Sequence, residues 1–551
     1  MSRSDPPAGQ PPETGTRCTR CGLPVGAGST CESWDFSLAD PLAPLCVWCG
    51  YDSADHDGYV HLVEHRDRTW VHRRAHLYSS LRALLQFDLR EQAELFTHLL
   101  KWILLGSIVG ALAGLSSAGF LFTLDRATQF RLDHPWMLWL LPVGGLMVGL
   151  PYHYVGHTSA AGNNLILDEI HEPRAWVPKR MAPLVYGGTV ITHLFGGSAG
   201  REGTALQMAG SLTDGASRLL RLEREDRRIM LIAALAGGFG AVFGVPIAGC
   251  VFGLEVQSVG RLRYDALIPA LTASLIGDLV VRGLGIHHTV TPDLGTLNIT
   301  GELVAKVALA GLAFGLTALV FAELTHGFKR VFGATISWPP LRPFIGGLLI
   351  VGLTYLVGTR DYNGLSVPLI TESLAGGTGI VALAFALKLL FTALTLGSGF
   401  QGGEITPLFV IGATLGAALG HALGVPVEIM ASVGFVAVFA GAANVPLAGT
   451  VMGAELFGAD GFVLYAVACV VAYVFSSHRG IYTSQRLAIP KGANGTASAT
   501  EDHDTLRTIG SQRRHRLPGR PIPGTDRPDQ VSRSAQTRAR RRTRGSHEIF
   551  K

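Results

Sequence analysis

Apolar and polar positions divide the chain into a long apolar middle and two polar ends. From residue 96 to about residue 476 the chain is nearly continuous apolar sequence, interrupted by short polar or glycine-containing stretches. The clearest apolar segments are 99–124, 135–156, 181–196, 229–255, 262–282, 302–325, 343–358, 380–396, 405–424, 428–441, 443–457 and 460–476. Several are shorter than the roughly 20 residues that a helix needs to cross a bilayer. Short helices at membrane depth are tolerated where they pack against protein or line a cavity. The pattern predicts an all-α, polytopic membrane protein with broken helices.

Composition agrees with this prediction and excludes an ordinary soluble enzyme. Of the 551 residues, 48% are hydrophobic and only 16% are charged, and the mean hydropathy is positive. Glycine accounts for 69 residues, many of them inside the apolar segments. Glycine lets transmembrane helices approach one another closely.

An internal repeat orders the apolar region. Short motifs recur 200 to 202 positions later in the chain: Gly110, Gly114 and Leu115 as Gly311, Gly315 and Leu316, Gly144-Gly145-Leu146 as Gly346-Gly347-Leu348, Gly162 as Gly364, Glu202 as Glu404, Thr204 as Thr406, and Val245-Pro246 as Val445-Pro446. The chain therefore contains two homologous halves, about 100–260 and 302–460. In such folds the substrate site lies where half-helix ends from the two repeats converge, near mid-membrane.

The stretch from Gly196 to Gly203 is the first candidate site. It reads Gly-Gly-Ser-Ala-Gly-Arg-Glu-Gly and precedes a helical pattern. Ionisable residues within a membrane are costly and usually mark a pathway. A helix start leaves backbone N–H groups that favour an anion, and the Glu202 carboxylate can take that anion's place. A glycine-rich turn with a surface ion pair is the alternative, but the second copy around Glu404 argues against it.

The polar N-terminal end carries a candidate metal site. Residues 1–17 have the composition of a disordered segment. Cys18, Cys21, Cys46 and Cys49 form two Cys-x-x-Cys pairs within residues 18–60, the spacing of a zinc ribbon. Disulfides or idle thiols are the alternatives, and Cys31 is either spare or a substitute ligand. A structural Zn²⁺ or free thiols would place this end in the cytoplasm.

Polar segments flank the apolar region on both sides. Residues 61–95 predict a basic connector on the cytoplasmic membrane face, followed by an amphipathic helix at 77–95. His61-x-x-Glu64-His65 within it matches an inverted zinc-peptidase motif, but no third ligand is identifiable. Residues 486–551 predict a disordered basic tail that is solvated or lies on anionic lipid. Apart from its charge, nothing in this tail indicates nucleic-acid binding.

Three motifs together resemble the CLC family of anion channels and proton-coupled anion exchangers. They are Gly200-Arg201-Glu202-Gly203, the stretch Gly402-Gly403-x-x-x-Pro407, and Tyr482 after the last apolar segment. The resemblance covers about residues 96–485. It implies that Glu202 is the external gating glutamate and that Tyr482 is the inner tyrosine at the central anion site. It also implies a homodimer with one pathway in each subunit.

Departures from the usual motifs resemble the bacterial fluoride/proton antiporters of this family. Chloride-handling members usually carry Gly-Ser-Gly-Ile-Pro at the first filter loop, where this chain has Gly162-Asn163-Asn164-Leu165-Ile166. The third loop reads Glu404-Ile405-Thr406-Pro407 in place of Ile-Phe-Ala-Pro, and Thr204 replaces a proline after Gly203. Val256 stands where many chloride exchangers have an internal proton-relay glutamate, although the neighbouring Glu255 remains.

The chemistry of these substitutions suits fluoride, a small and strongly hydrated ion. The Asn163 amide offers two N–H donors where a serine offers one hydroxyl, and Thr406 adds another donor. Glu404 is a second acid beside the path, and it either handles protons or is held by a hydrogen bond. The structural alternatives are that Asn163 caps a helix, that Tyr482 is an interfacial anchor and that Glu404 is a buried structural acid.

The sequence therefore predicts a transporter rather than an enzyme. It would export cytoplasmic fluoride in exchange for external protons, from the inner (plasma) membrane, as a homodimer with both termini cytoplasmic. Glu202 and Glu404 are assigned to gating and proton coupling. Anion binding is assigned to Gly162, Asn163, Asn164, Gly200, Arg201, Gly203, Ile405, Thr406 and Tyr482. A chloride/proton exchanger or passive anion channel is the alternative within the family. A membrane-anchored, zinc-dependent sensor or peptidase is the distant one.

Overall fold

The computed structural model describes residues 89–288, 292, 294–377, 379–491 and 505–506. The chain divides into two units, Met1–Phe96 and Thr97–Lys551, and of the first only the start of one helix is described. The predicted zinc ligands Cys18, Cys21, Cys46 and Cys49 lie outside the described residues. The His61 to His65 motif and most of the C-terminal tail lie outside them too.

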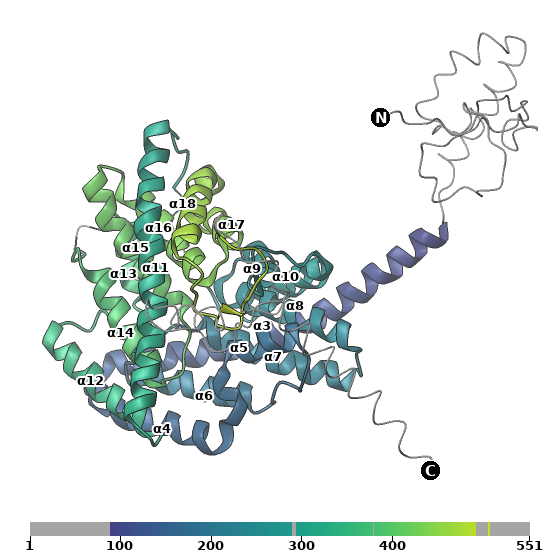
Figure 1. Ribbon diagram of the computed structural model, residues 1–551, viewed down its shortest axis with the longest axis horizontal. Helices are drawn as coiled ribbons and strands as arrows, with labels where there is room; N and C mark the ends of the chain where they lie inside the picture. The colour runs from purple at the N-terminus through teal and green to yellow at the C-terminus, as the bar shows by residue number, and fades with distance from the viewer. Residues whose placement is uncertain (1–88, 289–291, 293, 378, 492–504, 507–551) are drawn as a thin grey trace, which may run out of the picture. The chain divides into compact units, whose positions relative to one another are not determined.

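The described residues are predominantly helical and fall into two halves of the same element order (Figure 1). The first half contains α3 (Leu89–Asp133), α4 (Leu141–Pro151), α5 (Asn163–His171), α6 (Met181–Leu194), α7 (Glu202–Leu219), α8 (Arg224–Phe243), α9 (Pro246–Glu255) and α10 (Leu267–Gly283). The second half contains α11 (Gly301–Thr335), α12 (Leu341–Val357), α13 (Val367–Leu374), α14 (Ala384–Ser398), α15 (Ile405–Leu423), α16 (Val427–Ala443), α17 (Pro446–Phe457) and α18 (Phe462–Phe475). Short 3-10 turns η1 (Pro135–Leu140), η3 (His157–Ala161), η4 (Tyr264–Ala266) and η5 (Ala459–Gly461) and the π-helical turn η2 (Tyr152–Gly156) connect some of them.

The packing of the helices confirms the repeat. In the first half α8 packs against α7, α9 and α10, and in the second half α16 packs against α15, α17 and α18. Helix α9 begins at Pro246 and α17 begins at Pro446, as the 200-residue offset predicts. Proline suits the first position of a helix, where its missing N–H is not needed.

Equivalent helices of the two halves make reciprocal contacts across their boundary. A Cβ on Gly347 of α12 would lie 2.7 Å from the Pro142 Cα of α4, and a Cβ on Gly145 of α4 would overlap the backbone of Pro343 in α12. Glycine at both positions therefore lets these helices touch backbone to backbone. Reciprocity of this kind relates the halves by an approximate two-fold axis, as expected for an inverted repeat.

Some helices in the described part of the chain are long enough to cross a membrane, and others are half-length. Five qualify by length and apolar composition: Glu91–Asp133, Pro135–Ala161, Tyr264–Gly283, Gly301–Thr335 and Ile405–Leu423. The apolar segment 229–255 is two helices, because Gly244 ends α8 with a φ of +74° and Pro246 starts α9. Such breaks place helix ends inside the protein, where a polar ligand can reach them.

A cluster of phenylalanines in the centre of the unit joins the two halves. Phe239 and Phe252 of the first half stack on Phe439 of the second, and Phe409 stacks on Phe435 with ring centroids 4.0 Å apart. All five rings are buried. Phe409 belongs to α15, so this buried cluster packs against the helix at whose start the candidate site begins.

The segment after α18 is bonded back onto the membrane unit. Strands β1 (Ser258–Val259) and β2 (Arg486–Leu487) form a short parallel ladder with Ser258 opposite Arg486. The Gln485 Nε2 donates to the Val256 carbonyl at 2.7 Å and to the Ala443 carbonyl at 2.8 Å. These bonds extend into residues 486–491, the start of the predicted tail, and they fix the loop that carries Tyr482.

Candidate anion pathway

The Glu202 carboxylate lies at the junction of the two halves and is fully buried. It starts α7, and its Oε1 accepts a hydrogen bond from the Ile405 N–H at 2.5 Å. Its Oε2 accepts from the Thr406 hydroxyl at 2.7 Å and from the Arg201 N–H at 2.8 Å. A negative group thus occupies the N-terminal end of α15, where the helix dipole and free N–H groups favour an anion.

Two glycines make room for this carboxylate. Gly200 and Gly403 exchange backbone hydrogen bonds of 2.7 Å and 2.8 Å, forming an antiparallel bridge between the halves. A Cβ on Gly200 would lie 2.5 Å from the Glu202 Oε2, and a Cβ on Gly403 would overlap the same carboxylate. The alternative of a solvent-exposed turn with a surface ion pair is therefore excluded.

Glu404, the counterpart of Glu202 in the second half, stands one residue before α15. It is half-buried, and among the described residues its carboxylate has no hydrogen-bond partner. Its electrostatic interactions include Lys329 and Glu202. Two roles were predicted for Glu404: handling protons, or being held by a hydrogen bond. Within the described part of the chain no hydrogen bond holds its carboxylate.

Asn163 is the first residue of α5, and Gly162 before it has a φ of +60°. A Cβ on Gly203 would lie 3.4 Å from the Asn163 Nδ2 and 3.1 Å from the Gly403 Cα, so these three residues meet at one point. Within the described part of the chain the Asn163 Oδ1 is buried without a hydrogen-bond partner. A buried amide oxygen without a partner is costly, which is typical of a ligand or water site.

Gln207 is a polar residue of this region that the motifs do not identify. It lies on α7, is buried, and approaches Gly162, whose Cβ would stand 3.3 Å from the Gln207 Nε2. Its Oε1 is a second buried amide oxygen without a partner among the described residues. The signal in the sequence is a single amide five residues after Glu202.

Asn164, in the first turn of α5, is hydrogen-bonded to the loop that carries Tyr482. The Asn164 Oδ1 accepts from the Ser484 N–H at 2.9 Å and from the Thr483 hydroxyl at 3.4 Å. Tyr482 is buried, and its electrostatic interactions include Glu404 and Glu202. Asn164 therefore positions the loop of Tyr482.

Arg201 contributes its backbone to the site. Its N–H binds Glu202, whereas its guanidinium Nε is buried and has no hydrogen-bond partner among the described residues. The electrostatic interactions of the guanidinium include Glu202 and Asp125. The side chain thus supplies positive charge beside the carboxylate without a direct bond to it.

A buried lysine behind the Gly196–Gly203 loop was also not predicted. Lys388 of α14 is fully buried, and its Nζ donates to Ser198 Oγ at 2.9 Å, to the Gly364 carbonyl at 2.8 Å and to Ser366 Oγ at 2.9 Å. The ammonium thereby ties the loop of one half to the second half. The sequence signal is a lone Lys in the apolar segment 380–396.

Two further contacts hold the same loop. Both ring nitrogens of the buried His193 lie at hydrogen-bond distance from carbonyl oxygens, those of Thr189 at 2.9 Å and Ala199 at 3.0 Å. Thr204, which replaces a proline after Gly203, has its hydroxyl 2.6 Å from the Thr189 hydroxyl. Polar side chains of α6 thus fix the backbone on either side of Glu202.

Comparison with known proteins finds similarity to anion channels and transporters. The family model described as voltage gated chloride channel matches residues 144–477. A chloride/fluoride channel protein of Pseudomonas syringae pv. tomato is 48% identical over 412 residues, which are 74% of this chain and 91% of that protein. A proton/chloride exchange transporter of Cronobacter sakazakii is 27% identical over 57% of this chain and 71% of its own length.

Solved structures agree with the fold described above. The crystal structure of a CLC-type fluoride/proton antiporter superimposes with a TM-score of 0.68 and 33% identity, covering 71% of this chain and 98% of the other. A slow cyanobacterial chloride/proton antiporter matches in fold, with a TM-score of 0.59 and 19% identity over 68% of this chain and 94% of its own. With the two-halved helical fold and the buried glutamate at the junction, these matches establish that the chain is an integral membrane anion transporter of the voltage-gated chloride channel (CLC) family.

Proposed function

We propose that this protein is a fluoride/proton antiporter that exports cytoplasmic fluoride in exchange for external protons. The proposal rests on the set of donors that binds the Glu202 carboxylate. They are the Ile405 N–H, the Arg201 N–H and the Thr406 hydroxyl. These donors would serve a small anion as well as they serve a carboxylate oxygen. Carboxylate and anion therefore compete for one place.

Proton coupling follows from that competition. The ionised Glu202 is attracted to the start of α15 and closes the path. Protonation removes this attraction, so the Glu202 side chain leaves the three donors and an anion can bind to them. One proton therefore accompanies each opening of the path. Glu404 is a second acid close to Glu202, and among the described residues its carboxylate has no hydrogen-bond partner. It would hold a proton or pass it to and from Glu202.

The preference for fluoride rests on the amide donors. Asn163 lies at the meeting point of Gly203 and Gly403, and a strongly hydrated ion needs such donors in place of its water. The match to a structure called a fluoride/proton antiporter supports this choice. Because one relative is called a chloride/fluoride channel protein, passive anion flow is the alternative.

Reconstituted protein distinguishes these functions. We expect proteoliposomes to release fluoride faster than chloride and to take up protons as fluoride leaves, measured with ion-selective and pH electrodes. Asn163→Ser should reduce the fluoride preference about tenfold, since one hydrogen bond to an ion is worth roughly 1.5 kcal/mol. Equal fluxes of both ions in the parent protein would refute the fluoride assignment. Fluoride release without proton uptake would show a passive channel.

The distribution of basic residues supports a cytoplasmic N-terminal side. Lys101 of α3 forms an ion pair of 2.6 Å with Asp226 in the first turn of α8, so these two residues lie on one side of the membrane unit. Exposed arginines Arg221 and Arg224 adjoin that ion pair in the sequence. Basic residues mark the cytoplasmic side of membrane proteins. We propose that both termini lie on this cytoplasmic side and that the protein resides in the inner membrane.

A structural zinc ion at Cys18, Cys21, Cys46 and Cys49 remains part of the proposal. Purified protein should carry about one zinc per chain, measured by elemental analysis, because each Cys-x-x-Cys pair supplies two thiolates to a tetrahedral site. Replacing Cys46 and Cys49 with Ser should remove the zinc and leave fluoride transport intact. Zinc-free parent protein would contradict the ribbon, and lost transport in a folded variant would contradict its peripheral role.

A further inference from the structure

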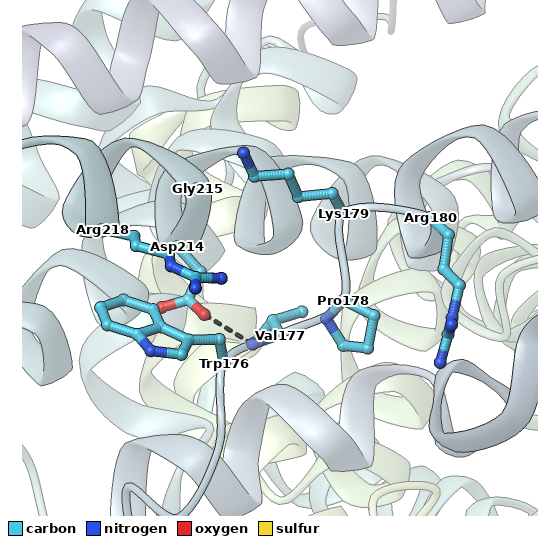
Figure 2. A pocket seen from close by; sticks show the side chains of 8 residues that line it. All are labelled: Trp176, Val177, Pro178, Lys179, Arg180, Asp214, Gly215 and Arg218. Atoms are coloured by element: carbon cyan, nitrogen blue, oxygen red, sulfur yellow. Dashed lines mark hydrogen bonds between the residues drawn. The ribbon is translucent and has the colours of Figure 1, made fainter.

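A pocket outside the anion pathway lies between the linker that precedes α6 and the last turns of α7. Its volume is about 350 Å³, and it is lined by Trp176, Val177, Pro178, Lys179, Arg180, Asp214, Gly215 and Arg218. Figure 2 shows Arg218 and Trp176 at one end of the pocket and Arg180 at the other, with Lys179 between them. Three of the lining side chains are cations.

The one acidic residue of the pocket is held within a buried hydrogen-bond network. The Asp214 carboxylate is buried and accepts from the Val177 N–H at 2.6 Å and from the Arg227 Nε at 2.6 Å. The Arg227 guanidinium also donates to Glu169 at 3.1 Å. This buried network of two carboxylates and one guanidinium fixes the floor of the pocket, and its single excess negative charge is outweighed by the three cations at the rim.

The cations at the rim have no such partner. Lys179, Arg180 and Arg218 are exposed, and within the described ranges none of them pairs with a carboxylate. The Arg218 guanidinium lies 5.6 Å from the Trp176 ring centre, a cation–π contact that holds it over the opening. Helix α6 begins next to Arg180, and its N-terminal dipole adds to the positive potential. The pocket therefore favours an anion.

The size and chemistry of the pocket indicate a phosphate group rather than a halide. A volume of about 350 Å³ far exceeds that of a single small ion. Guanidinium groups bind phosphate oxygens through paired N–H donors, and lysine adds a point charge. Three cations in one pocket match a phosphodiester that is held on more than one side.

Exposed apolar side chains adjoin the pocket. Trp176 is 41% exposed, and Leu219 and Leu220, directly after Arg218, are 83% and 45% exposed. Tryptophan concentrates at the level of lipid headgroups, and leucines beside it suit acyl chains. The pocket belongs to the side of α7 that leads into the start of α8, which is the side bearing Lys101 and Asp226.

We propose that this pocket binds the phosphate headgroup of an anionic phospholipid from the cytoplasmic leaflet. Lys179 and Arg218 hold the phosphodiester, Arg180 extends the positive surface, and the Trp176 ring and Leu219 contact the lipid body. The anionic lipids of that leaflet are attracted to basic segments at the membrane surface. A lipid there would brace the linker before α6, the helix whose far end precedes the Gly196–Gly203 loop.

Native mass spectrometry of the full chain in detergent tests this assignment. Phosphatidylglycerol should bind more tightly than phosphatidylcholine of the same chain length. Lys179→Gln and Arg218→Gln should each weaken phosphatidylglycerol binding about fivefold and leave phosphatidylcholine binding unchanged. Arg221→Gln and Arg224→Gln, which remove charges outside the pocket, are the matched controls and should change binding less than twofold.

Three results would overturn the proposal. Equal binding of both lipids would exclude headgroup recognition, and equal losses in the pocket and control variants would indicate diffuse surface charge. Displacement of phosphatidylglycerol by millimolar inorganic phosphate, with phosphate retained by the protein in the absence of lipid, would assign the pocket to a soluble anion. All four positions are exposed, so the variants should elute as the parent does in size-exclusion chromatography.

Discussion

At the scale of single residues, the site depends on a carboxylate placed where an anion would bind. Glu202 receives all of its hydrogen bonds from neutral donors, two from backbone and one from Thr406. No cation bonds to it directly among the described residues. Glu202 therefore stays at these donors because its negative charge is attracted to the N-terminal dipole of α15. Protonation removes that attraction.

Glu202→Gln should separate anion movement from proton movement. The amide keeps the size of the side chain but is neutral, and its NH₂ group cannot accept from the Ile405 N–H. We expect fluoride-driven proton uptake to fall to background, while the remaining fluoride flux no longer varies with pH. Parallel fluoride- and pH-electrode recordings from proteoliposomes measure both.

Glu302→Gln is the matched control for this experiment, because Glu302 is an exposed first-turn glutamate of α11 paired with Lys306. It should transport as the parent does. Glu404→Gln tests the second acid of the repeat under the same conditions. Persistent proton pumping by Glu202→Gln would place the coupling group elsewhere, with Glu404 as the next candidate.

The residues of this site divide into those that the sequence predicted and those that it could not. Glu202 was predicted from its place at a helix start, and Ile405 and Thr406 from the resemblance of residues 404–407 to the family's third loop. Lys388 was missed because its acceptors Ser198 and Gly364 lie on loops distant in sequence. Only the fold brings them within hydrogen-bond distance of one ammonium. Hydrophobic periodicity predicts where helices lie, but it does not show which loops come together in the fold.

At the scale of helices, the two halves cap one another at their boundary. The Glu255 carboxylate ends α9 and accepts from the Leu447 N–H at 3.1 Å and the Ala448 N–H at 2.8 Å of α17. Glu455 of α17 accepts in turn from the Ile247 N–H at 2.9 Å and the Ala248 N–H at 2.6 Å of α9. Each short helix thus satisfies the free donors of the other. Glu255 and Glu455 lie 200 residues apart, at the offset of the repeat, but only the structure shows that each caps the other's helix.

Glu255→Gln should weaken the fold but leave proton coupling intact. Both Glu255 oxygens are engaged as a helix cap, so this acid is not free to relay protons in place of the missing acid at Val256. Losing the charge should cost about 1 to 2 kcal/mol at the start of α17. A lower melting temperature in detergent with unchanged fluoride-to-proton coupling is the expected result.

Glu455→Gln is the matched partner, since it removes the equivalent cap from α9. It should lower the melting temperature as well, by less, because Glu455 is exposed whereas Glu255 is buried. Uncoupled transport by Glu255→Gln at an unchanged melting temperature would instead put Glu255 on the proton route.

At the scale of the whole membrane unit, the face around these caps exposes two short helices and a carboxylate. Helices α9 and α17 have 10 and 12 residues, about 15 to 18 Å, whereas the apolar core of a bilayer is about 30 Å thick. They pack on each other and on α10 and α18, and they leave Ile247 and Leu447 nearly half exposed. Glu455 is exposed on the same face. A carboxylate and half-length helices facing lipid are unfavourable, so protein should cover them.

We expect a second copy of the chain to cover this face, as predicted from the family resemblance. Ile247→Trp and Leu447→Trp add bulk at the centre of the face and should shift the protein from dimer to monomer, measured by cross-linking and mass photometry in detergent. Leu356→Trp on α12, which packs against α4 and α14, is the matched control and should remain dimeric. Because Glu202 and Ile405 belong to the same chain, we expect each monomer to hold its own pathway and the fluoride flux per chain to be preserved. A parent protein that runs as a monomer, or tryptophan variants that stay dimeric, would show that another surface or the lipid covers the caps.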